Sequence, residues 1–93
     1  MNYPDITFYG ARLNSFKEAH IIYDIVLEHK PKTIFEIGTY GGFMTLWLGL
    51  ASKEYSGRVI TLDYKRNHNP TAEQTTKLNK LDNVHLFQDT NIL

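Results

Sequence analysis

The chain has 93 residues, in which ten basic residues balance ten acidic ones and no cysteine occurs. The length suits one small domain, and the lack of cysteine excludes disulfides and cysteine-ligated zinc or iron–sulfur sites. Balanced charge gives no field that would recruit nucleic acid or an anionic membrane, and no apolar stretch is long enough to span a bilayer. The first residues lack the basic and apolar regions of a secretory signal, so we expect a single cytoplasmic domain over residues 1–93.

The N-terminal part of the chain predicts an irregular lead-in followed by a helix. Residues 1–14 mix aromatic residues with proline and glycine and show no period. Ser15 then stands three positions before Glu18, the spacing of a capping box at a helix start. Apolar residues follow at helical spacing as far as Leu27. Pro31 stops the helix, because the residue before a proline is driven out of the helical region.

The rest of the chain alternates short apolar runs with helical patterns. Runs rich in β-branched and aromatic residues predict strands at 33–37, 58–62 and 84–87, and helical spacing predicts helices at about 43–54 and 70–81. The strands begin 25 and 26 residues apart, which suits βαβ units with parallel strands. Residues 15–93 therefore predict an α/β fold of αβαβαβ order. It is a Rossmann-like doubly wound parallel sheet, truncated to about three strands in the order 3-2-1, with three helices.

The segment from Glu36 to Gly42, where the first strand turns into the second helix, carries the clearest chemical signal. Its glycines let the backbone approach a ligand, and the following helix directs free N–H groups toward that ligand. Tyr40 stands where the dinucleotide fingerprint GxGxxG has its second glycine, so a pyrophosphate has less room. A second acid, Asp63, ends the next strand, where a carboxylate can accept both hydroxyls of a ribose.

At these residues the chain resembles the class I S-adenosylmethionine-dependent methyltransferases, over roughly residues 15–90. Their first motif reads acidic-x-Gly-x-x-x-Gly and is matched by Glu36, Gly38 and Gly42. The wording of this motif is similar to the catechol-type O-methyltransferases, and other segments are similar to the cephalosporin-hydroxylase-like and sugar O-methyltransferase branch. The family's catalytic and metal-binding acids follow its fourth and later strands. The resemblance therefore covers only the N-terminal half of the family's domain.

The resemblance implies a role for each matched position. Gly38 and Gly42 pass beneath the methionine part of the cofactor, and Glu36 orients their loop and faces the cofactor's amino end. Asp63 holds the ribose hydroxyls. The implied cofactor-binding residues are Glu36, Gly38, Thr39, Tyr40, Gly41, Gly42, Asp63, Tyr64 and Asp89. Tyr64 is expected beside the adenine and Asp89 near its amino group.

Two positions depart from the family pattern. Met44 stands where catechol-type enzymes carry a small hydroxyl residue, so Thr45 would have to take that role. Gln88 precedes Asp89 where the family usually has glycine.

The sequence thus predicts the cofactor-binding half of an S-adenosylmethionine-dependent methyltransferase that acts on a small-molecule, oxygen acceptor. No catalytic residue is identified, and the scattered histidines lack the spacing of metal ligands. Two alternatives stay open: a non-catalytic module for nucleoside binding or protein interaction, and a nicotinamide-binding half-domain. Because the sheet face opposite the helices is expected to be bare, we also expect self-association or a partner chain. Because the family's catalytic acids follow its fourth and later strands, we expect no turnover by these residues alone.

Overall fold

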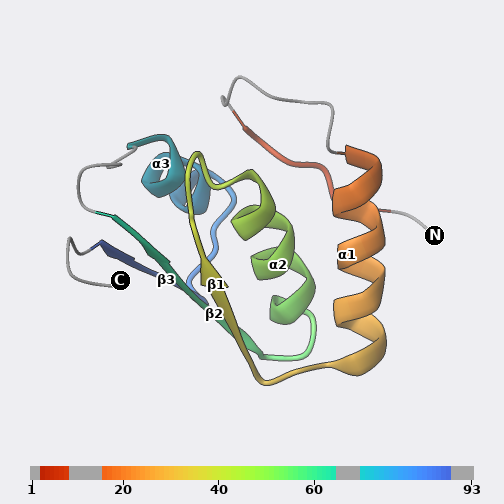
Figure 1. Ribbon diagram of the computed structural model, residues 1–93. Coiled ribbons are helices and arrows are strands. Elements are labelled where there is room, and N and C mark those ends of the chain that lie inside the picture. The colour runs from red at the N-terminus through yellow and green to blue at the C-terminus, as the bar shows by residue number, and fades with distance from the viewer. Residues whose placement is uncertain (1–2, 9–15, 65–69, 89–93) are drawn as a thin grey trace.

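Helices and strands alternate along the chain in the predicted order (Figure 1). The structure, a computed structural model, describes residues 3–8, 16–64 and 70–88. Its elements are α1 (Phe16–His29), β1 (Thr33–Ile37), α2 (Phe43–Lys53), β2 (Arg58–Asp63), α3 (Pro70–Leu78) and β3 (Val84–Gln88). Ser15 of the predicted capping box and Asp89 of the predicted site lie outside the described residues.

The three strands form one parallel sheet in the order β1-β2-β3. Glu36 in β1 is paired with Thr61 in β2, and Asp63 at the end of β2 is paired with Gln88 in β3. The predicted strand order is therefore confirmed. Since the strands are parallel, the acids of β1 and β2 meet near the same edge of the sheet.

Helix α2 is the centre of the core. It packs on β2, and α1 and α3 lie against it on either side (Figure 1). Trp47 is 1% exposed and meets the rings of α1 edge-on, while Leu46 and Ala51 are also buried. Because α2 has neighbours on several sides, its buried residues extend around the helix instead of forming one stripe. Among the described residues, no helix is long and apolar enough to cross a membrane.

The opposite face of the sheet carries no helix among the described elements (Figure 1). Phe35, Ile37 and Phe87 are 67%, 68% and 55% exposed there, as predicted from the one-sided helices. The strand registers align two rows of side chains on this face. We call the surface made by Phe35, Ile37, Ile60, Leu62, His85 and Phe87 the open sheet face.

Helix α3 ends earlier than predicted, at Leu78 instead of about Leu81. Lys80 adopts a left-handed backbone with φ 55°, and the N–H of Leu81 bonds to the carbonyl of Thr76. These are features of a helix C-cap. The sequence does not predict this C-cap, because lysine and not glycine stands at position 80. Leu81 nevertheless stays buried, which explains why its apolar side chain continued the predicted pattern.

The N-terminal segment 3–8 lies across the helix layer. The Tyr3 hydroxyl donates a 2.8 Å hydrogen bond to Asp24 in α1. The side-chain amide of Asn79 accepts from the N–H of Thr7 and donates to its carbonyl oxygen. The segment therefore joins α1 to the end of α3 and does not cover the open sheet face.

Candidate functional site

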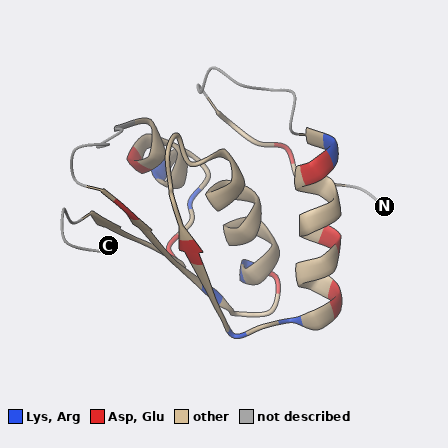
Figure 2. Ribbon diagram, in the orientation of Figure 1, with Lys and Arg blue, Asp and Glu red and all other residues tan. Residues whose placement is uncertain are grey.

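Strands β1 and β2 each carry one acidic residue, Glu36 and Asp63, toward their carboxyl ends. Figure 2 shows one red segment in each of these strands. Glu36 is half-buried, and its Oε1 atom accepts hydrogen bonds from the hydroxyls of Thr45 and Thr61. The Oγ1 atoms of Thr61 and Thr39 lie 2.6 Å apart. We call Thr39, Thr45 and Thr61 the threonine cluster; it links the glycine-rich loop, α2 and β2 to one carboxylate.

Burial raises the pKa of Glu36 above its ordinary value. The hydrogen bonds from Thr45 and Thr61 lower this pKa in part, and the negative charge of Asp63 raises it further. A cation placed beside such a carboxylate stabilises its charged form. The site is therefore suited to a positively charged ligand group.

Asp63 is at the tip of β2 as predicted, but it is only 4% exposed. Its Oδ2 atom accepts a hydrogen bond from the backbone N–H of Tyr40, and Oδ1 accepts one from that of Tyr64, each at 2.8 Å. The strand tip and the loop after β1 are thus tied together by one carboxylate.

The glycine-rich loop contains three residues with positive φ: Gly38 at 94°, Tyr40 at 50° and Gly42 at 87°. The N–H of Gly38 continues the ladder by bonding to the carbonyl of Leu62 at 2.7 Å. A Cβ on Gly42 would lie 3.0 Å from the Cα of Ala72, in α3. Gly42 is therefore needed for the packing of α3, a role that the sequence analysis did not assign to it.

Gly42 is also the N-cap of α2, and no side chain caps this helix start. The first-turn N–H groups and the positive end of the helix dipole lie beside the loop. Such a helix start favours a negatively charged ligand group. The loop region thus offers an acceptor for a cation at Glu36 and donors for an anion at α2.

A cavity of about 250 Å³ adjoins this region. Its lining comes from the loop after β1, from α3 and from the end of β3: Thr39, Ala72, Glu73, Leu86, Phe87 and Gln88. Among the predicted site residues, Thr39 is in this lining.

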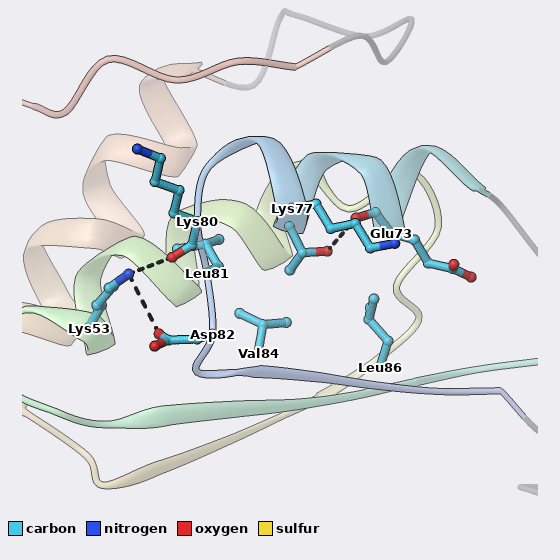
Figure 3. Close-up of a pocket in the computed structure, with 9 residues that line it drawn as sticks. Lys53, Glu73, Lys77, Lys80, Leu81, Asp82, Val84 and Leu86 are labelled. Carbon is cyan, nitrogen blue, oxygen red and sulfur yellow. Dashed lines mark hydrogen bonds and ion pairs between the residues drawn. The ribbon is translucent and has the colours of Figure 1, made fainter.

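A second cavity, of about 580 Å³, lies between α3 and β3 and contains none of the predicted site residues (Figure 3). Its floor is apolar, and Lys53 at its rim is bonded to the carbonyl of Lys80 and paired with Asp82. Figure 3 shows the ammonium of Lys80 directed away from the cavity. We assign no ligand to it.

The structure brings together most residues that the sequence predicts for the site. The sequence analysis did not assign Thr61 to the site. Its place in the alternating pattern of β2, on the buried face and paired with Glu36, is the signal that could have identified it. Thr45, predicted as a substitute for the family's hydroxyl residue, donates its hydroxyl to Glu36. Within residues 3–8, 16–64 and 70–88, no three His, Cys, Asp or Glu side chains are grouped as metal ligands.

No protein-family model matches the chain. The catechol O-methyltransferase of Mycobacterium tuberculosis (strain ATCC 25618 / H37Rv) is 42% identical over 43 residues, which are 46% of this chain and 19% of that protein. A Klebsiella pneumoniae structure assigned as an O-methyltransferase superposes with a TM-score of 0.73 and 26% identity, covering 86% of this chain and 36% of that one. The O-methyltransferase of Bacillus cereus, solved in complex with S-adenosylhomocysteine (SAH), superposes with a TM-score of 0.70 and 29% identity. The match covers 83% of this chain and 35% of that one.

The chain thus spans about a fifth of the curated relative and about a third of the two solved structures. Its three parallel strands and three helices match a fragment of the Rossmann-like methyltransferase fold. The resemblance to the class I S-adenosylmethionine-dependent methyltransferases, of the O-methyltransferase branch, is therefore confirmed over this part of their length.

Proposed function

We propose that the chain is the cofactor-binding part of an S-adenosylmethionine-dependent methyltransferase, which transfers a methyl group to an oxygen of a small-molecule acceptor. One observation carries the proposal: Glu36, held by the threonine cluster, and Asp63 stand on adjacent strand ends beside the glycine-rich loop. The relatives named as O-methyltransferases, one of them bound to SAH, support the same cofactor and reaction class.

The donor set fits the charged and polar parts of S-adenosylmethionine. Glu36 would face its ammonium group, the start of α2 its carboxylate, and Asp63 its ribose hydroxyls. Tyr64, which follows Asp63, would lie beside the adenine. The cofactor supplies a methyl group activated on sulfur, and this chain's residues would contribute its binding and orientation.

Three further points belong to the proposal. The names of the relatives favour an enzyme over the non-catalytic module that the sequence left open. We propose a cytoplasmic location for a chain without cysteine, and we propose that a second copy or another polypeptide covers the open sheet face in solution.

Calorimetric titration with SAH tests the cofactor assignment. We expect the chain to bind SAH, and Asp63→Ala to weaken binding by roughly tenfold or more, since charge-assisted hydrogen bonds contribute about 1.5–3 kcal/mol. The matched control is Asp82→Ala, which removes an 87% exposed carboxylate outside the site and should leave binding unchanged. Binding of NAD in preference to SAH, or equal SAH affinity in both variants, would contradict the assignment.

A further inference from the structure

We propose that Tyr40 is a gate of the cofactor site, and this inference rests on the proposed function. In this structure its ring covers Gly38 while its backbone is held by Asp63. One residue therefore covers the glycine assigned to the methionine part of the cofactor and contacts the carboxylate assigned to the ribose.

The ring lies directly against the α-carbon of Gly38. A Cβ built on Gly38 would lie 2.7 Å from Cε2 of Tyr40, 3.3 Å from Cζ and 3.4 Å from the hydroxyl oxygen. The ring therefore covers the side of Gly38 from which a Cβ would project. Access to Gly38 from this side requires the ring to rotate away.

The side chain of Tyr40 is free to make that rotation. It is 68% exposed, so solvent surrounds most of the ring. Rotation about χ1 would break the van der Waals contact with Gly38.

Asp63 holds the gate in place through the main chain. Tyr40 has φ 50°, a left-handed backbone that a tyrosine adopts only when its surroundings impose it. The 2.8 Å bond from its N–H to Oδ2 of Asp63 is such a restraint. Ribose hydroxyls that donate to Asp63 would compete with this N–H, so ligand binding at Asp63 would loosen the ring over Gly38.

NMR of the Gly38 α-protons tests the position of the ring, because protons against an aromatic face or edge experience its ring current. We expect their shifts in the parent chain to differ from those in Tyr40→Ala and to approach the Tyr40→Ala values when SAH saturates the site. Stopped-flow mixing with SAH tests the gate itself. Tyr40→Ala should raise the association rate constant several-fold, and Tyr40→Phe, which keeps the ring, should not.

Tyr40→Gly serves as a second variant, since glycine accepts the positive φ without strain if alanine prevents folding. Ile21→Ala is the control: it removes another exposed apolar side chain, on α1 and outside the site, and should leave the association rate unchanged.

Three outcomes would overturn the gate. If the Gly38 shifts in the SAH complex keep their parent values, the ring does not move, although cofactor binding stands. If Tyr40→Ala changes only the dissociation rate, Tyr40 contacts the ligand and does not gate it. If calorimetry detects no SAH binding by the parent, Tyr40→Ala or Tyr40→Gly, the proposed function fails and the gate fails with it.

Discussion

Thr61 donates a 2.8 Å hydrogen bond to Oε1 of Glu36, the residue paired with it across the β1–β2 ladder. Thr61 is fully buried, so the bond lies under α2, away from the open sheet face. Because strand residues alternate between faces, a shift of one residue in the pairing would turn one of these side chains to the other face. The register of β1 and β2 therefore fixes the position of the site's carboxylate.

Thr61→Val should test this relationship, because valine keeps the shape and removes the hydroxyl. Glu36 would lose one hydrogen bond and Thr39 its contact with Oγ1, which should cost about 1–3 kcal/mol of folding free energy. The pKa of Glu36 should rise further, since the lost bond lowers it in the parent. Urea unfolding and an NMR titration of the Glu36 carboxyl carbon measure the two effects. Thr33→Val, at an exposed position of β1, is the control and should change stability little.

Glu36→Gln should stabilise the fold at neutral pH while weakening SAH binding. Burial raises the pKa of Glu36, so its charged form is disfavoured in the folded state; the amide keeps an acceptor oxygen for Thr45 and Thr61 without the charge. A folded-state pKa raised above the unfolded value means that the parent gains stability as pH falls through the folded-state pKa. The difference between variant and parent should therefore shrink on acidification and level off below the ordinary pKa of glutamate. Thermal unfolding from pH 7 to pH 4 measures it, and a constant difference across this range would contradict the assignment.

The positions of five of the six elements could be predicted because local signals mark them. β1 and β2 are dense in β-branched residues, and Pro31 and Gly57 punctuate the chain at the ends of the first two helices. These signals act over a few residues, so the sequence carries them directly. The end of α3 was placed too late because Leu81 continues the apolar spacing while the backbone has already turned at Lys80.

The chemistry of the site could be predicted only in part, because some roles depend on contacts between distant segments. The acids at 36 and 63 and the glycines are visible as a motif in the sequence. The contact of Gly42 with Ala72, and the bond between Tyr40 and Asp63, join residues more than 20 positions apart. No local pattern encodes such pairs, so the structure is needed to see that Asp63 is nearly buried.

The two positive-φ glycines of the loop should differ in their tolerance of alanine. Both variants incur backbone strain, but a Cβ on Gly42 meets the backbone of α3, whereas one on Gly38 meets the rotatable ring of Tyr40. We expect Gly42→Ala to cost about 2–4 kcal/mol and Gly38→Ala about 1–3 kcal/mol. Gly41, whose φ is not positive, supplies the control variant Gly41→Ala. Chemical unfolding gives the three values; a smaller loss for Gly42 than for Gly38 would mean that α3 moves aside easily.

The open sheet face should cause the chain to self-associate. Phe35 and Ile37 are each about two-thirds exposed there, and their strand, β1, pairs with a neighbour on one side only within the described sheet. Burying a large apolar side chain stabilises by about 1.5–3 kcal/mol, and a strand edge offers further hydrogen bonds. Light scattering at micromolar concentration should therefore give a mass above 10.8 kDa for the parent.

A double variant, Phe35→Lys and Ile37→Lys, places two like charges on this face and should return the chain to a monomer. The matched control is Ile21→Lys, which adds a charge at a 51% exposed position of α1, on the helix layer. Circular dichroism checks that each variant keeps its helices. If Ile21→Lys abolished association and the sheet variant did not, the contact would lie on the outer surface of α1. A parent that is monomeric and unfolds cooperatively would show that this chain needs no partner on the open sheet face.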